Sequence, residues 1–149
     1  LTHQDLTKLD KDTVYNEVFL DKQNLERMFG CQITGMAYPY GTYNDEVVQI
    51  LKKCKIQYAR SVVSSGAFKL QKNLLIFKPT CHHADENIWE LLEKFLKEKS
   101  EEKQLFYIWG HSYEFDVNNN WKRMEEILDR LIGHNNIFYG TNREVLLPC

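Results

Sequence analysis

Histidine is the residue type in this sequence best suited to chemistry, and four of the five histidines stand in polar segments. His82 and His83 follow an extended apolar stretch, His111 comes two residues after the apolar run 105–109, and His3 precedes the first predicted helix. Imidazole exchanges a proton near neutral pH and binds first-row metal ions. The sequence therefore predicts a site for acid–base or metal chemistry in these segments.

Helices and strands alternate along the chain, and they must position the polar segments. The predicted helices are 12–29, one that starts at Asn44 or Asp45, 85–96 and 121–131; the predicted strands are 33–38, 57–63, an extended pair within 67–77, 105–109 and 137–139. Such alternation is typical of an α/β fold with parallel strands and right-handed crossovers. Because the loops after the carboxyl ends of parallel strands share one edge, we expect 38–41, 80–83, 110–113 and 140–142 to lie together.

Composition excludes several classes of protein. The chain has 149 residues, with 19 Lys and Arg against 21 Asp and Glu, so no basic surplus exists for nucleic-acid binding. Its hydrophobic content of 43% is that of a folded domain. The longest apolar run, 105–109, is far shorter than the roughly 20 residues of a membrane-spanning helix. We expect one domain over 1–149, with no nucleic-acid partner and no membrane span.

The segment Cys81-His82-His83 is the densest group of metal-ligand side chains. Imidazole and thiolate both bind first-row metals, so the segment could contact a substrate or hold an added metal ion. A polar loop whose histidines bond to neighbouring backbone fits equally well. None of the cysteines forms a C-x-x-C pair, which argues against a zinc ribbon and favours buried or idle thiols. Ser112 is not expected to act as a nucleophile, because no G-x-S-x-G turn is present.

Three motifs resemble those of the polysaccharide deacetylase family, the carbohydrate esterases that remove acetyl groups from chitin-like and peptidoglycan-like sugars. The motifs are LTHQDL at 1–6, MAYPYG at 36–41 and WGH at 109–111. The resemblance implies a distorted (β/α) barrel with mainly parallel strands. The chain starts inside the family pattern, whose Asp-Asp pair would lie upstream of Leu1. We therefore expect a partial barrel that lacks the N-terminal strand or strands of the family barrel.

The resemblance also implies roles for particular residues. His3 matches the second metal-binding histidine of the family, and the first would fall four positions earlier. The backbone N–H of Tyr40 matches an oxyanion donor, and His111 matches the acid that protonates the leaving amine. The complete protein is expected to hold a divalent ion, zinc or similar, which this chain alone would bind weakly or not at all. The candidate substrate contacts are Tyr38, Pro39, Trp109, Tyr113, His82 and His83.

Within these segments the sequence departs from the family pattern at three places. Ala37 stands where the family has an arginine that contacts the catalytic aspartate, and Arg60 on the next strand is a candidate substitute. Residues 81–85 occupy the interval where the family carries an Asp-Trp motif that tunes the acid histidine, but no Asp-Trp pair is present, and Asp85 is expected to cap a helix. Trp109 replaces a leucine that lines the acetyl pocket, and a place in the core is its alternative.

These observations favour a metal-dependent deacetylase that acts on N-acetylated, or alternatively O-acetylated, sugars or glycans. One alternative is a non-catalytic carbohydrate-binding relative, which Ala37 favours. Another is an inactive truncated piece that associates with itself through exposed barrel edges. The partner expected in the first two cases is a carbohydrate. The sequence is compatible with both a cytoplasmic and a cell-wall or extracellular location.

Overall fold

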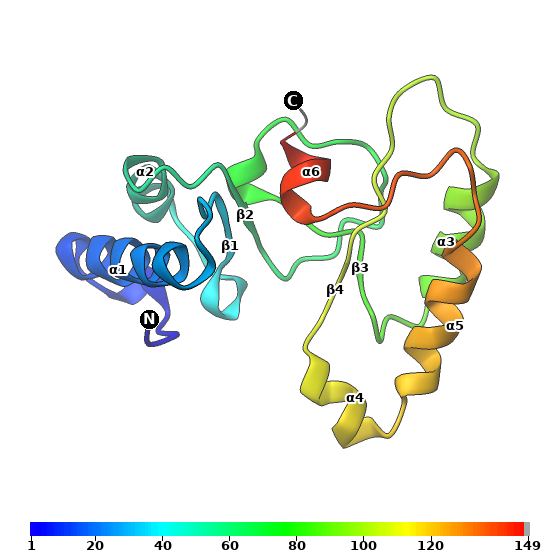
Figure 1. Ribbon diagram of the computed structural model, residues 1–149, viewed down its shortest axis with the longest axis horizontal. Helices are drawn as coiled ribbons and strands as arrows, with labels where there is room; N and C mark the ends of the chain where they lie inside the picture. The colour runs from blue at the N-terminus through cyan, green and yellow to red at the C-terminus, as the bar shows by residue number, and fades with distance from the viewer. Residues whose placement is uncertain (148–149) are drawn as a thin grey trace. The chain divides into compact units, whose positions relative to one another are not determined.

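The computed structural model describes residues 1–147, which separate into two compact units (Figure 1). The first unit contains residues 1–62, 71–78 and those from 140 onward, and the second contains residues 63–70 and 79–139. Each unit has one pair of parallel strands, so the prediction of an α/β fold with parallel strands is confirmed. The described residues form two two-stranded sheets and no closed barrel. That 1–149 acts as a single domain stays a prediction.

The first unit is built around the parallel strands β1 and β2, with Gly35 opposite Tyr58 and Ala37 opposite Arg60. Its core is formed by the facing sides of α1 and α2 and by β2, and Val14, Leu51 and Ala59 are almost fully buried. The elements are η1 (Leu6–Lys8), α1 (Lys11–Phe29), β1 (Gly35–Ala37), η2 (Pro39–Gly41), α2 (Asp45–Lys53), β2 (Tyr58–Arg60), η3 (Leu74–Ile76) and α6 (Asn142–Leu146). Only Tyr38 separates β1 from η2, so this turn stands at the carboxyl end of the strand.

Local sequence signals set the ends of the helices in this unit. The Asp10 carboxylate accepts from the backbone N–H groups at the start of α1, and Gly30, with φ of 64°, ends that helix in the left-handed conformation. The side chain of Asn44 accepts from the N–H of Val47 at the start of α2. The prediction that Gly30 ends the first helix is confirmed, and of the two predicted caps of the second helix, Asn44 and Asp45, the structure has Asn44.

The second unit places two strands beside two amphipathic helices. Strands β3 and β4 are parallel, with Cys81 opposite Ile108 and His82 opposite Trp109. Helices α3 and α5 lie side by side in Figure 1 and bury Ile88, Leu92 and Ile127 completely. The elements are β3 (Cys81–His82), α3 (Ile88–Lys97), β4 (Ile108–Trp109), α4 (Ser112–Asn118) and α5 (Trp121–Leu131). Helix α4 follows β4 after two residues, and it therefore begins at the carboxyl end of that strand.

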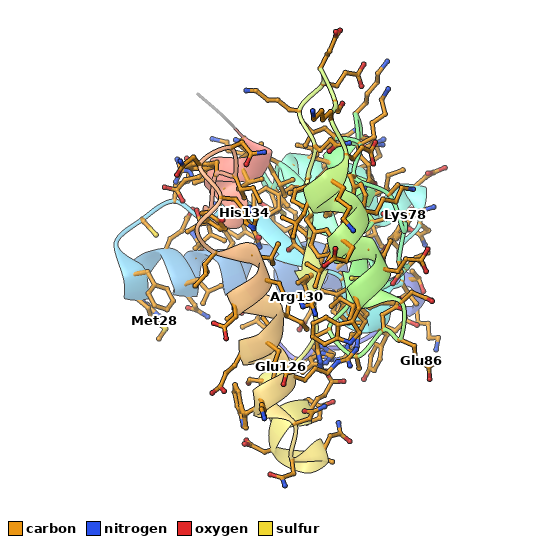
Figure 2. All side chains as sticks on the ribbon, turned by 90° about the vertical axis from the view of Figure 1, so that its right-hand side faces the viewer. Met28, Lys78, Glu86, Glu126, Arg130 and His134 are labelled. Atoms are coloured by element: carbon orange, nitrogen blue, oxygen red, sulfur yellow. The ribbon has the colours of Figure 1, made fainter. Side chains whose placement is uncertain are left out.

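Polar contacts on the outer side of α3 and α5 complete this packing. Arg130 of α5, labelled in Figure 2, donates to the carboxylate of Glu93 on α3 at 2.7 Å, and its guanidinium lies 5.3 Å from the ring of Trp89. The aromatic contact shields one face of the guanidinium while the carboxylate pairs its charge. The predicted helices at 85–96 and 121–131 are thus present, although α3 begins at Ile88.

The strand predicted at 137–139 is not formed. Phe138 and Tyr139 are exposed, and the N–H of Ile137 donates to the carbonyl of His134 in a turn. Within 1–147 no strand pairs with these residues, so they are not part of either sheet. Strands 33–38, 57–63 and 105–109 are shorter than predicted, because only their central or final residues make ladder bonds. In the described part of the chain, none of the helices combines the length and apolar content needed to cross a bilayer.

Replacing Tyr38 with phenylalanine should lower the free energy of unfolding by about 1–2 kcal/mol. The hydroxyl of Tyr38 is buried and donates to the carbonyl of Leu75 at 2.6 Å, so its loss leaves a buried carbonyl without that partner. Urea denaturation measures the change. Tyr40→Phe is the control, because the Tyr40 side chain is 65% exposed and its substitution should have little effect. An equal loss in both variants would contradict the assignment.

Candidate active site

The first candidate group lies at the carboxyl end of β1, where His3 and Tyr40 meet. Their ring centroids are 5.1 Å apart in an edge-on arrangement. Both residues have positive φ angles, 58° for His3 and 55° for Tyr40, which side chains other than glycine rarely adopt. Gly41 completes the turn with φ of 73°, and any side chain there would overlap Val62. Two strained residues in contact are typical of a site whose geometry is held by the surrounding fold.

A pocket of about 370 Å³ in the first unit has His3, Ala37 and Pro39 among its lining residues. Glu17 lies in the same wall and accepts from the backbone N–H of Thr2 at 2.8 Å. That hydrogen bond is the main reason why the pKa of Glu17 is lowered. Tyr38 does not face this pocket: it is 3% exposed and stacks on Tyr43, so its ring belongs to the core. Arg60, the candidate substitute for the missing arginine, is the residue opposite Ala37 across the two strands.

His3 supplies one imidazole for a metal ion, and the described residues do not complete a site around it. Within 1–147, the group of three or more histidine, cysteine or carboxylate side chains with ligand atoms within 4.8 Å of one another does not include His3. Zinc sites in proteins have at least three protein ligands. The described residues around His3 therefore do not by themselves form a site for the divalent ion that the family resemblance implies.

The second candidate group lies in the second unit, where β3 and β4 end. His82 is the last residue of β3, His83 follows it, and His111 is the N-cap residue of α4. All three surround one carboxylate oxygen, Oε2 of Glu114. The Nε2 atoms of His82 and His83 lie 3.2 and 2.8 Å from it, and Nδ1 of His111 lies 3.5 Å from it. Parallel pairing of the two strands is what brings these histidines together.

Glu114 was not identified from the sequence, although a signal for it exists. It is the third residue of α4, and its carboxylate reaches back to accept from the N–H of His111 at 2.8 Å. A carboxylate three residues after a helix N-cap is typical of the capping box. Burial raises the pKa of Glu114, but this hydrogen bond, the hydrogen bond from His83 and the charges of His82 and His83 outweigh it and hold the pKa at about 2. Glu114 is therefore an anion at neutral pH.

The hydrogen bonds of the histidines fix their protonation. The Nδ1 atom of His82 accepts from the N–H of Ala84 at 3.1 Å, so its ring proton is on Nε2, toward Glu114. The Nε2 atom of His83 donates to the Glu114 carboxylate, since an ionised carboxylate can only accept. Burial, together with the neighbouring His83, lowers the pKa of His82, which favours the neutral ring.

These bonds bear on whether the group binds a metal. His82, His111 and Glu114 are the residues whose ligand atoms lie close enough for an ion. However, the centre of the group is occupied by Oε2 of Glu114, and the Nε2 of His82 carries a proton. A ligating histidine instead donates its other nitrogen's proton to a neighbour. Cys81 does not belong to this group, and burial raises the pKa of its thiol to about 12. The observed arrangement is a hydrogen-bonded one around an anion.

The side chains in and around this histidine group range from buried to solvent-exposed. His83 is 2% exposed, and its Nδ1 has no hydrogen-bond partner. Trp109 is half-buried, with its ring 4.5 Å from that of His82. His111 and Tyr113 are exposed, with rings 5.4 Å apart. Of the predicted substrate contacts in this unit, Tyr113 faces solvent, whereas His83 is buried with its ring 4.3 Å from that of Phe115.

The loop that carries the two histidines is held by Arg123 of α5. Its guanidinium donates to the carbonyls of His83 at 3.1 Å and Asp85 at 2.8 Å and lies 5.4 Å from the ring of Trp89. The carboxylate of Asp85 accepts from the N–H of Asn87, so it caps the turn that leads into α3. Asp85 was expected to cap the helix, but it caps this preceding turn, and the N-cap residue of α3 is Asn87, two residues later.

Lowering the pH should weaken the contribution of Glu114 to stability. Its pKa is about 2 in the folded protein and ordinarily 4.5, so the stabilisation is fully present above 4.5 and is lost as the pH falls toward 2. We expect the difference in unfolding free energy between the native protein and Glu114→Gln to be largest near neutral pH and to shrink across that range. Urea denaturation at several pH values measures it. A difference that grows in acid would contradict the assignment.

Comparison with known proteins gives a family for the first part of the chain. The family model of polysaccharide deacetylases matches residues 1–59, which contain His3 and the turn 39–41. The solved structure of Streptococcus pyogenes deacetylase PplD in complex with acetate is similar over 52% of this chain and 34% of that chain, with 24% identity and a TM-score of 0.49. The chain thus spans about a third of that protein's length. No curated protein matches the chain significantly. Residues 1–59 are therefore similar to the polysaccharide deacetylase family.

Proposed function

We propose that the complete protein carrying this chain hydrolyses acetyl groups from N-acetylated sugars or glycans. The observation that carries the proposal is the contact between His3 and Tyr40, two residues with positive φ angles in the segment that matches the family. Backbone strain at two touching residues is costly and persists where a site needs that geometry. The distorted barrel of the family would be completed by strands outside the described residues.

Tyr40 is proposed to act through its backbone. Its N–H belongs to the turn η2, in which the N–H of Gly41 donates to the carbonyl of the buried Tyr38. A fixed N–H that points at the developing oxyanion stabilises it without reorganisation, and one such donor contributes about 10²–10³ in rate. The side chain of Tyr40 is exposed beside His3 and Pro39, where it can contact the sugar.

His111 is proposed to protonate the leaving amine. Its side chain is 48% exposed at the first turn of α4, so it can reach a substrate, and imidazole exchanges protons near neutral pH. Trp109 and Tyr113 flank it and offer aromatic faces to a sugar ring. His3 is proposed as one ligand of a divalent ion such as zinc. The other ligands would have to come from outside the described residues.

A non-catalytic carbohydrate-binding protein is the second candidate. Ala37 favours it, because an alanine cannot make the contact to a catalytic aspartate that the family's arginine makes. Such a protein would keep the exposed aromatic side chains and bind sugar without hydrolysis. Self-association through unpaired strand edges also stays a prediction, which light scattering on the 149-residue chain would test.

The experiment that separates these functions is an acetate-release assay with oligomers of N-acetylglucosamine and the complete protein. Hydrolysis should release acetate and free amine in equal amounts. Sugar binding that is indifferent to a chelator, without acetate release, would replace the proposal with the carbohydrate-binding function. If the protein neither binds N-acetylated or O-acetylated glycans nor releases acetate from them, both the deacetylase function and the carbohydrate-binding function are contradicted.

A further inference from the structure

The segment that carries His3 is held by hydrogen bonds on both sides of that residue. Before it, Thr2 donates its backbone N–H and its hydroxyl to the carboxylate of Glu17 on α1. After it, Asp5 begins η1, and its Oδ1 accepts from the N–H of Thr7 at 3.1 Å and from the hydroxyl of Thr7 at 2.7 Å. Asp5 therefore caps a turn that starts close to His3.

Asp5 has one partner more than this cap requires. Its Oδ1 also accepts from the hydroxyl of Thr42 at 2.8 Å, although Thr42 lies 37 residues later in the chain. The Thr42 hydroxyl lies 3.2 Å from the carbonyl of Pro39 as well, but it has a single proton, and the shorter contact to an ionised carboxylate is the stronger one. Within 1–147, this is the hydrogen bond that joins segment 1–6 to segment 39–42.

The start of α1 provides an internal comparison. The carboxylate of Asp10 accepts from the N–H groups of Asp12 and Thr13 and from the hydroxyl of Thr13 at 2.6 Å. All of these donors lie within three residues of Asp10. Asp5 makes the same kind of cap, so the bond from the distant threonine is an addition to the capping function.

We infer that Asp5 is a positioning residue, which holds the segment of His3 against the turn that contains Tyr40. Asp5 follows His3 by two residues. Its partner Thr42 likewise follows Tyr40 by two residues, so the bond joins the two segments close to the contact between the two rings.

The backbone angles at His3 and Tyr40 explain why such a bond is needed. Both residues have positive φ angles, which cost free energy and persist only where the surrounding contacts impose them. The bond from Thr42 to Asp5 constrains both segments at once. Its effect on catalysis rests on the proposed function, whereas the positioning itself does not.

The test is Thr42→Val in the complete protein, read by the nuclear Overhauser cross-peaks between the ring protons of His3 and Tyr40. Valine keeps the shape of threonine and removes the hydroxyl, while Asp5 keeps its own cap. The cross-peaks should be present in the native protein and lost in Thr42→Val. Their absence from the native protein, or their presence in Thr42→Val, would overturn the inference.

Thr13→Val is the matched control. It removes the hydroxyl that donates to Asp10, so it weakens a cap in the same unit without touching the bond between the two segments. The ring cross-peaks should therefore be unchanged. A second pair of variants repeats the comparison from the carboxylate side: Asp5→Ala should lose the cross-peaks, and Asp10→Ala should keep them. Retention in Asp5→Ala, or loss in either control, would also overturn the inference.

Acetate release provides a second readout. Thr42→Val should lower kcat by about 10–100-fold with little change in KM, because the N–H of Tyr40 is proposed to stabilise the transition state rather than to bind the substrate. Thr13→Val should leave kcat unchanged. A native kcat in Thr42→Val with lost cross-peaks, or an equal loss of kcat in both variants, would overturn the catalytic consequence. If the native complete protein releases no acetate while the cross-peaks respond as expected, the proposed function fails and the positioning by Asp5 stands.

Discussion

Replacing His111 with asparagine in the complete protein should lower kcat for acetate release by about 10²–10⁴-fold, the usual contribution of a general acid. The physical reason is that the expelled amine needs a proton, and the exposed ring of His111 is proposed to supply it. Asparagine is chosen because position 111 is the N-cap of α4, where asparagine is among the preferred residues. The fold of α4 should therefore survive the substitution.

The control for this variant is His134→Asn. His134 lies beyond the end of α5, with Nε2 3.1 Å from the carbonyl of Arg130, and it has no part in the proposed site. Its substitution should leave both kcat and KM unchanged. A native rate in His111→Asn would show that His111 is not the acid. A large loss in both variants would point to a general effect on folding, which urea denaturation would reveal.

Replacing Gly110 with alanine should lower the free energy of unfolding by about 1–3 kcal/mol, as overpacking of a core typically does. A Cβ at this position would overlap the ring of His83, and His83 is 2% exposed and has no open space to move into. The ring also cannot swing aside without losing its bond to Glu114 at 2.8 Å. The substitution should therefore disturb both the packing of His83 and its hydrogen bond to Glu114.

A double-mutant cycle isolates this contact. In a His83→Ala background the new methyl group has no ring to meet, so Gly110→Ala should cost much less there than in the native protein. Urea denaturation of the four proteins gives the coupling free energy. An equal cost in both backgrounds would contradict the steric assignment and leave only the loss of glycine's backbone freedom at position 110.

The parts of the fold that the sequence predicted well are those set by neighbours along the chain. Asn44 begins α2 and Gly30 ends α1 through bonds that span at most four residues. The apolar spacing of 121–131 likewise depends on helix geometry alone, and α5 has those bounds. The prediction of a strand at 137–139 was wrong, because a strand needs a partner strand, and the local sequence does not show whether one is present.

The candidate site shows the same division. His82, His83 and His111 could be chosen from residue type and from their place after apolar runs. Glu114 was missed because its role comes from contacts with residues up to 32 positions away, across two strand ends. Tyr38 was assigned to substrate, yet its hydroxyl is bonded to Leu75, 37 residues later, and its ring is buried. Such pairings arise from the tertiary fold, and no local spacing reveals them.

The proposed deacetylase needs the turn at Tyr40 and the ring of His111 to act on the same molecule, and one titration tests this most directly. Acetate, the expected product, is added to the ¹⁵N-labelled complete protein while the amide signal of Tyr40 and the imidazole signals of His111 are followed. The proposal predicts that both sets of signals shift and give one dissociation constant. Two different constants, or a response from only one of the two residues, would contradict it.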